Sequence, residues 1–331
     1  MFRGFVFLVI FGSLTAGLGF AQSAQPSAPG AAAGSSDSSA AGQPKQVRKK
    51  EDWTKLAVDR KTWQPNVGGV SLGKSETEKY SSELVRLLWR PQDPIDIWII
   101  KPRGVEKPRV ALYLYTFPDD IDRFMDESWR QGATQNGLAA VGFISALTGE
   151  RVRGNRPMRE WFVRELQESM ASSAHDAQLI IDYLAQRGDL NVDQVGIFGQ
   201  GSGGAIAILA AAADPRIRAV DVLNPWGDWP DWLKSSPVVP DDQRGEFMAP
   251  EFLQKATVVE PVAYLPSLKD RALRVQQILD YPNTPPAARD KIAATVPAGD
   301  LVQYKDRTAH AEAWKKTGLS GWLASALGSK P

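Results

Sequence analysis

The segment that decides the fold of this chain is Val195–Gly204 (VGIFGQGSGG), which runs directly into Ala205–Ala213 (AIAILAAAA). The short run of β-branched and aromatic residues predicts a buried strand, and the alanine-rich run predicts a buried helix. Glycine is the residue that most readily lets a backbone reverse, so the four glycines between the two runs predict a sharp turn. We therefore expect a strand, a tight turn and a helix in immediate succession.

Around this unit the chain alternates between strand-like and helix-like segments. Residues 84–89 and 95–100 flank a turn at 91–94 and predict an antiparallel pair. Strands separated by helices require right-handed crossovers and a mostly parallel sheet. Further strands are expected at 110–115, 139–144, 195–198, within 214–223, at 273–279 and at 301–304, and helices near 121–129 and 161–187. The polar pair Gln276–Gln277 leaves a helix open as the alternative for residues 273–279.

This element order, with the glycine turn after the fifth strand, resembles the α/β-hydrolase superfamily over residues 52–331, and within it the serine esterases, peptidases and dienelactone-hydrolase-like proteins. The resemblance implies a mostly parallel central sheet with helices on both faces. It also implies a lid-like insertion after the sixth strand, at about residues 224–268.

In that superfamily the turn reads Gly-x-Ser-x-Gly and its central serine is the nucleophile. The register that keeps a glycine two residues away on each side puts Gly201 at the centre and moves the serine to Ser202. A working turn uses the backbone N–H at Ser202 in the oxyanion hole, and glycine forms no acyl intermediate. The resemblance therefore implies a lost nucleophile. The rival interpretation is that Ser202 attacks while the N–H of Gly203 holds the oxyanion.

The general base that the resemblance implies is His310, one of only two histidines. It follows the strand-like residues 301–304, is expected just before the last helix, and lies in a segment similar to the family pattern Gly-His-Ala-x-x-Trp. A single histidine is also often structural, and this is the interpretation that we prefer for His175, which lies within a predicted helix.

Two carboxylates are candidates for orienting His310. Asp280 lies in the loop after the expected seventh strand, and Asp228 follows the sixth strand; both are also ordinary loop residues. The second oxyanion donor would be the backbone N–H of Phe117. Its loop lacks the glycine usual in the family, and the following Pro118 has no N–H.

Three tryptophans, Trp226, Trp229 and Trp232, lie in the expected lid-like segment. Aromatic faces suit a small-molecule ester or an apolar or aryl ligand, so these residues are candidates for pocket contacts, with packing of the lid as the alternative.

Charge and composition exclude several other classes. Lys plus Arg, 39, nearly equals Asp plus Glu, 38, which argues against a nucleic-acid partner. Two histidines and no cysteine argue against a metal centre, and we expect no cofactor. A lesser alternative is dinucleotide binding, because Gly199, Gly201 and Gly204 match Gly-x-Gly-x-x-Gly and Asp221 follows at a suitable distance.

The first 21 residues have the charged start, apolar centre and small-residue exit of a signal peptide, which predicts a secreted or periplasmic protein. Their apolar stretch is too short for stable membrane insertion. Residues 22–51, rich in Ala, Gly, Ser and Pro, predict a disordered linker. The sequence thus predicts an exported hydrolase-fold protein that is non-catalytic or weakly active. The alternative is an active carboxyl-ester hydrolase using Ser202, His310 and Asp280 or Asp228.

Overall fold

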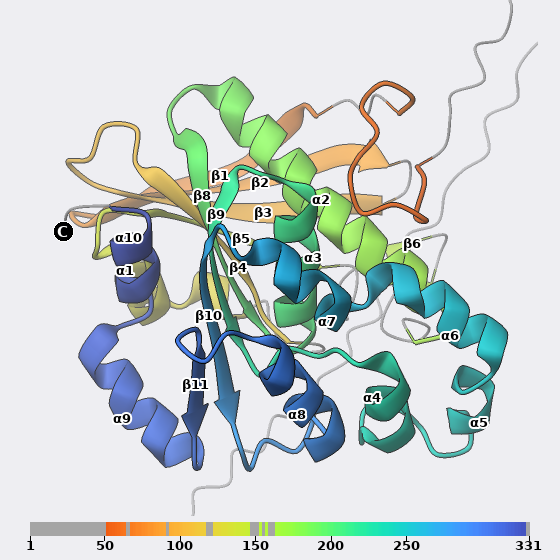
Figure 1. The fold of residues 1–331 in the computed structure, drawn as a ribbon. Helices are drawn as coiled ribbons and strands as arrows, with labels where there is room; N and C mark the ends of the chain where they lie inside the picture. The colour runs from red at the N-terminus through yellow and green to blue at the C-terminus, as the bar shows by residue number, and fades with distance from the viewer. Residues whose placement is uncertain are drawn as a thin grey trace, which may run out of the picture. The chain divides into compact units, whose positions relative to one another are not determined.

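A nine-stranded sheet forms the centre of the molecule, with strand order β1-β2-β3-β5-β4-β8-β9-β10-β11 (Figure 1). The strands from β5 to β11 in this order pair in parallel, whereas β1, β2 and β3 are antiparallel to their neighbours. The strands are β1 Gly69–Glu76, β2 Tyr80–Arg90, β3 Asp93–Pro102, β4 Arg109–Leu114, β5 Ala139–Phe143, β8 Asn191–Gln200, β9 Ile217–Leu223, β10 Ala272–Ile278 and β11 Leu301–Tyr304. A separate two-residue pair is formed by β6 Val152–Arg153 and β7 Arg156–Pro157.

The structure is a computed structural model that describes residues 51–63, 67–90, 93–116, 122–145, 152–153, 156–157 and 163–328. These residues belong to one compact unit of chain, which starts at Arg48. The expected signal peptide, 1–21, and all of the expected linker except Glu51 lie outside the described residues. Glu51 itself is packed into the domain, with its side chain 6% exposed.

Helices cover both faces of the sheet, as the resemblance implies. In Figure 1, α1, α9 and α10 lie on one side of β8 to β11, and α3, α7 and α8 lie on the other. The helices are α1 Glu127–Thr134, α2 Leu166–Arg187, α3 Ser202–Ala213, α4 Trp229–Ser235, α5 Arg244–Phe247, α6 Pro250–Ala256, α7 Pro261–Tyr264, α8 Pro286–Thr295, α9 Arg307–Thr317 and α10 Gly321–Ala326. Short 3₁₀ turns occur at Asp122–Met125, Thr257–Val259 and Leu265–Leu268.

Two hydrophobic clusters hold these layers together. The larger lies on the face covered by α2 and α3 and includes Ile197 and Ile206. The smaller lies on the face of α1 and α10 and includes Phe198 and Leu323. Consecutive residues of β8 therefore serve opposite faces, as the period of two in a strand requires. The sheet is consequently buried on both sides, which explains the continuous apolar runs of its central strands.

Most of the predicted strands are confirmed. The antiparallel pair at 84–89 and 95–100 is β2 and β3, with Leu84 opposite Trp98. Residues 273–279 form a strand, β10, not the alternative helix; its polar pair is accommodated because Gln276 donates to Asp221 (2.8 Å) and Gln277 donates to the Arg289 carbonyl (2.9 Å). The edge strand β1 was not predicted, since all eight of its residues are exposed and it has no buried face to impose a pattern.

Two predicted helix positions differ from the structure. The pattern at 121–129 becomes a 3₁₀ turn followed by α1, whose N-terminus is fixed at Asp126, the side chain of which accepts from the Trp129 N–H (2.7 Å). His310 was expected just before the last helix; it follows β11 and precedes α10, but it lies inside a further helix, α9, whose start Asp306 caps by accepting from the Ala309 N–H (2.9 Å).

Candidate functional site

Gly201 forms the turn between β8 and α3 and has an unusual backbone conformation. Its φ of 56° and ψ of −117° lie in the region that glycine populates readily and other residues rarely adopt. The turn is fixed by backbone hydrogen bonds on two sides: the Gly201 N–H donates to the Leu223 carbonyl (2.9 Å), and its carbonyl accepts from the Trp226 N–H (3.0 Å). The end of β9 and the segment after it therefore hold this turn in one conformation.

The space that a side chain on Gly201 would need is already filled. A Cβ atom added there would lie 2.3 Å from Oγ1 and 2.8 Å from Cβ of Thr116, and 3.3 Å from Nε1 of Trp226. Real Cβ atoms essentially never approach other heavy atoms within 3.0 Å. Thr116 follows β4, and Trp226 belongs to the segment after β9. Since β4 and β9 are the two strands that flank β8, the chain on both sides of β8 closes over the turn.

The first turn of α3 packs just as closely against the sheet. A Cβ on Gly203 would lie 2.5 Å from the Leu114 carbonyl oxygen and 2.7 Å from that of Tyr115. This approach of backbone to backbone explains the glycine. Ser202, the first residue of α3, is fully buried.

His310 lies on α9, half-buried among aromatic rings and facing the carboxyl ends of the parallel strands. Its ring makes an edge contact with Tyr304, with centroids 5.0 Å apart, and stacks on Trp314 at 6.0 Å. Burial and the positive charge of Arg274 lower the pKa of His310, and the negative charge of Asp221 offsets part of this effect. The imidazole is therefore biased toward its neutral form.

His310 lines a pocket of about 430 Å³ at the carboxyl ends of β8, β9 and β10, on the face of the sheet that α9 covers. Its wall combines aromatic rings, amides and cationic side chains. The residues that line it are Tyr115, Arg123, Phe198, Gln200, Leu223, Asn224, Gln276, Ile278, Tyr281, Arg307, His310, Ala311 and Trp314. Gly201 and Ser202 are not among them, so the structure does not bring the predicted base and either predicted nucleophile position together in this pocket.

The two candidate acids lie outside this pocket as well. Asp280 is exposed, two residues after the end of β10. Asp228 precedes α4 and is tied to α8 by an ion pair with Lys291 (3.1 Å), whose amine also contacts Asp231 (3.0 Å). Partial burial raises the pKa of Asp228, although Lys291 opposes this rise. Figure 1 places α4 and α8 on the opposite side of β10 and β11 from α9, the helix that carries His310. Asp228 is not among the residues that line the pocket of His310.

Asp221 is the carboxylate whose charge acts on the pKa of His310. From the sequence, this residue was a candidate only for binding a dinucleotide. Both of its oxygens are occupied: Oδ1 accepts from Arg274 Nε (2.9 Å) and from Gln276 (2.8 Å), and Oδ2 accepts from an Arg274 terminal nitrogen (2.5 Å). The side chain is 1% exposed and lies within β9. Its oxygens therefore serve the sheet and are not presented to a ribose.

The segment 224–268, expected as a lid, folds into α4 to α7 with short connecting turns. Trp226, Trp229 and Trp232 are buried, with Trp232 packed 4.5 Å from Trp226 and 5.7 Å from Trp229, centroid to centroid. Glu260 joins the start of α4 to α7 by accepting from the N–H groups of Asp228 (2.8 Å), Trp229 (2.8 Å) and Val262 (3.0 Å). These rings form core, and a movable lid stays a prediction. Phe117, the predicted oxyanion donor, lies outside the described residues.

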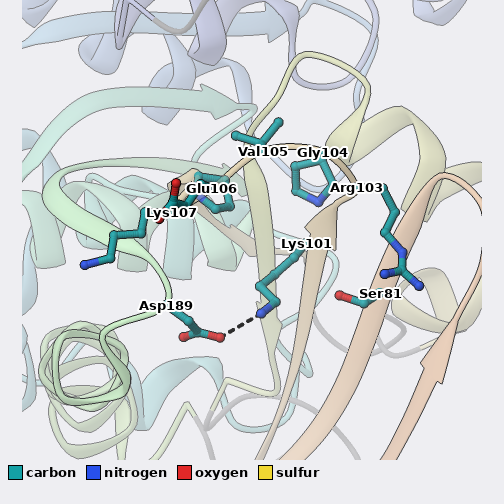
Figure 2. Close-up of a pocket in the computed structure, with 10 residues that line it drawn as sticks. Ser81, Lys101, Arg103, Gly104, Val105, Glu106, Lys107 and Asp189 are labelled. Carbon is teal, nitrogen blue, oxygen red and sulfur yellow. Dashed lines mark hydrogen bonds and ion pairs between the residues drawn. The ribbon is translucent and has the colours of Figure 1, made fainter.

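A second hollow of about 420 Å³ lies at the other end of the sheet, between the ends of β2 and β3 and the chain before β4. In Figure 2, Lys101 and Asp189 point toward one another across it, 2.7 Å apart. Two further cations line it: Arg103 bonds Glu76 and the Thr77 carbonyl, and Lys107 lies beside Glu106 in the chain. Because charges of both signs line this hollow and two of its cations are already paired with carboxylates, the pocket at His310 is the stronger candidate site.

Within the described chain, no group of three or more His, Asp or Glu residues is arranged to hold a metal ion. The described helices also include none with the length and apolar character needed to cross a membrane.

Most residues of the pocket at His310 were not predicted from the sequence. The sequence predicted His310, but not Arg123, Arg307 or Asn224, because these residues come from three separate segments that only the fold brings together. One signal was available for Asn224: it follows directly after the sixth predicted strand, where parallel sheets commonly place ligand-binding residues.

No protein-family model matches the sequence, and no curated protein matches it either. Solved structures do match. An acetyl xylan esterase from Thermoanaerobacterium sp. JW/SL YS485 superposes with a TM-score of 0.58 at 16% identity, covering 77% of this chain and 88% of that one. An acetyl xylan esterase from Paenibacillus sp. R4 gives 0.57 at 15% identity, over 75% and 86%. An S-formylglutathione hydrolase from Agrobacterium tumefaciens gives 0.53 at 12% identity, over 72% and 91%. Together with the strand order and the turn at Gly201, these likenesses show that the chain has the α/β-hydrolase fold.

Proposed function

We propose that this chain is an exported α/β-hydrolase-fold protein in which the serine-hydrolase reaction is lost or very weak. The observation that carries the proposal is Gly201, which occupies the turn after β8 where the fold presents its nucleophile. A residue without a side-chain oxygen forms no acyl intermediate, so the two-step route through a covalent enzyme is closed at this position.

The surroundings of the turn support the same conclusion. A nucleophile needs free space above it for the substrate carbonyl and the general base, but here Thr116 occupies the position of the first side-chain atom and Trp226 lies 3.3 Å from it. If the nucleophile had been lost by substitution alone, the space above Gly201 would be empty. Because this space is filled, we infer that the turn now contributes to the packing of the core.

The alternative, an active carboxyl-ester hydrolase, requires Ser202 to attack with His310 as base and Asp280 or Asp228 as orienting acid. Ser202 is fully buried and does not line the pocket of His310, while Asp228 is paired with Lys291. This alternative needs rearrangement of α3 or α9. Dinucleotide binding is also disfavoured, since Asp221 is bonded within the sheet.

Labelling with a fluorophosphonate probe tests the proposal, because such a probe reacts covalently with an activated serine. We expect no labelling of the purified protein, and hydrolysis of 4-nitrophenyl acetate no faster than that of its Ser202→Ala variant. Labelling that disappears in Ser202→Ala would establish the active alternative and overturn the proposal. The His310→Gln variant provides the matched control, since a true triad loses labelling in both variants.

A small molecule remains the expected partner. Two of the structures with a similar fold are named as acetyl xylan esterases, which supports an ester as one type of ligand to test. The aromatic residues that line the pocket of His310 support an apolar or aryl molecule as the other. Export is tested separately by determining the N-terminus of the protein recovered from the producing cell. A mature start near residue 22 is expected, and a retained Met1 in protein from the cytoplasm would contradict export.

A further inference from the structure

We propose that the pocket at His310 binds a small aryl carboxylate, with Arg123 and Arg307 holding the carboxylate and the aromatic wall holding the ring. This inference goes beyond the loss of turnover, because it assigns a ligand class and its binding residues. It also stands independently of that loss, since the pocket does not include Gly201 or Ser202.

The charge of the pocket favours an anion. Arg123 and Arg307 line it, and no Asp or Glu of the described residues does so. Neither arginine forms an ion pair within the described part of the chain; each instead lies over an aromatic ring. The guanidinium carbon of Arg123 is 4.5 Å from the ring centroid of Tyr115, and that of Arg307 is 5.6 Å from that of Tyr281. A guanidinium stacked in this way keeps N–H groups at its edge for bidentate bonds to a carboxylate.

The remaining wall favours a flat ring. Tyr115, Phe198, Tyr281 and Trp314 all line the pocket, and Trp314 and His310 form a stacked pair with an interplanar angle of 27°. Aromatic rings prefer offset-stacked or edge-to-face contacts, which a planar ligand can make with several of these residues together. The volume of about 430 Å³ lies within the range of pockets for small ligands.

Asn224 supplies an independent observation. Its side chain is 2% exposed, and its Oδ1 accepts from the Ile278 N–H (2.7 Å), but its Nδ2 is buried with no hydrogen-bond partner within the described chain. Buried donors are normally paired, so Nδ2 is an unmet hydrogen-bond donor beside the pocket wall, although the atom itself is closed off from the pocket space. Asn224 also has a φ of 45°, a conformation that non-glycine residues rarely adopt and that is often found at ligand sites.

The floor of the pocket is rigid and polar. Gln276 donates to Asp221 (2.8 Å), and its Oε1 accepts from the Tyr304 hydroxyl (3.1 Å). Arg274 neutralises Asp221 behind this floor, so the buried carboxylate does not repel a bound anion. The geometry therefore combines two cations and aromatic walls around one space.

Isothermal titration of the full chain with 2-naphthoate, and with the uncharged 2-naphthamide, tests the proposal. The two probes share shape and ring, so their difference isolates the carboxylate. We expect 2-naphthoate to bind at least about tenfold more tightly than 2-naphthamide, and Arg123→Met and Arg307→Met each to weaken its binding by about tenfold, as for a lost charged hydrogen bond. Both arginines are exposed, so these variants keep the fold, which circular dichroism verifies.

Arg218→Met is the matched control, because Arg218 is exposed near the opposite end of the same strand, β9, whose carboxyl end borders the pocket. It should leave the affinity unchanged. In NMR spectra, 2-naphthoate should shift the imidazole signal of His310, assigned with His310→Gln, and leave that of His175 in place. Equal binding of the two probes, equal losses in the pocket and control variants, or no binding at millimolar probe would each overturn the proposal. The fluorophosphonate result bears only on turnover, so the two conclusions can fail separately.

Discussion

The side chain of Thr116 occupies the space into which a side chain on Gly201 would project, with Oγ1 2.3 Å from the position of a Cβ atom there. Thr116 follows β4 and Gly201 follows β8, two strands that pair directly with Leu114 opposite Gly199. The contact therefore arises from the register of the sheet. It makes the absence of a side chain at Gly201 a requirement of packing as well as of backbone conformation.

Substitution of Gly201 by alanine should destabilise the protein by about 2–4 kcal/mol, the sum of an unfavourable φ and an overpacked contact. The measurement is the free energy of unfolding in urea. Gly104→Ala is the matched control: Gly104 also has a positive φ, 75°, but a Cβ there meets nothing within 4 Å. Gly104→Ala should lose less stability than Gly201→Ala, and equal losses would contradict the contact with Thr116.

The double variant Gly201→Ser/Thr116→Gly should be more stable than the sum of the two single changes predicts. Removing the threonine side chain frees the space that the new serine needs, so the two positions are coupled by about 1–2 kcal/mol. A double-mutant cycle of unfolding free energies measures this coupling. If the effects are simply additive, Thr116 is not the residue that excludes a side chain from Gly201.

Arg90 should be far more important for stability than its matched surface counterpart, Arg86. The Arg90 side chain is 7% exposed and contacts Glu51 (2.5 Å) and Asp176, with Asp93 3.8 Å away. Arg90→Met leaves these carboxylates without their cation in the interior and should cost about 3–5 kcal/mol. Arg86, 43% exposed and paired with Asp96, should cost less than about 1 kcal/mol when changed to methionine. Similar melting temperatures for the two variants would contradict a buried charge cluster.

Glu51 should make the protein less stable in acid. Burial acts to raise the pKa of Glu51, but hydrogen bonds and charge from Arg90 and His175 outweigh it and lower the pKa to about 2. Since the folded-state pKa lies below the ordinary value of 4.5, the stabilisation is fully present above pH 4.5 and is lost as the pH falls toward 2. Its size is on the order of 3 kcal/mol. Urea unfolding across this pH window should show a shallower decline for Glu51→Gln than for the parent protein; parallel curves would contradict the lowered pKa.

His310 should titrate below the ordinary histidine value of 6.5. Burial and Arg274 lower its pKa, and Asp221 opposes them, so removing the cation with Arg274→Gln should move the NMR titration midpoint of His310 upward. An unchanged midpoint in that variant would show that Arg274 does not act on the ring.

Much of the fold could be predicted from periodicity and glycine placement. The strand, turn and helix around Gly201 have strong local signals, because a buried strand and a buried helix differ in length and in their flanking residues. The edge strand β1 has no buried face and hence no such signal. The position of His310 within α9 depends on the capping bond of Asp306, and a polar residue three positions before an alanine does not distinguish a cap from a loop.

The site was less predictable than the fold. The family pattern predicted the position of Gly201. The residues that close the space above it, Thr116 and Trp226, lie 85 residues before it and 25 residues after it in the sequence. Likewise, the polar pair Gln276–Gln277 weakened the strand prediction because its partners, Asp221 and Arg289, lie on other elements. Contacts between residues on different elements of the sheet leave no pattern in the local sequence, so they cannot be predicted from it.

The contacts of Glu51 determine on which face of the sheet the described domain begins. Glu51 is bound to Arg90 and, through His175 (2.6 Å), to α2, which packs on the larger hydrophobic cluster. The pocket residues Phe198, Leu223 and Ile278 belong to the cluster on the reverse face. The start of the described domain is thus fixed on the face of the sheet opposite to the cluster to which these pocket residues belong.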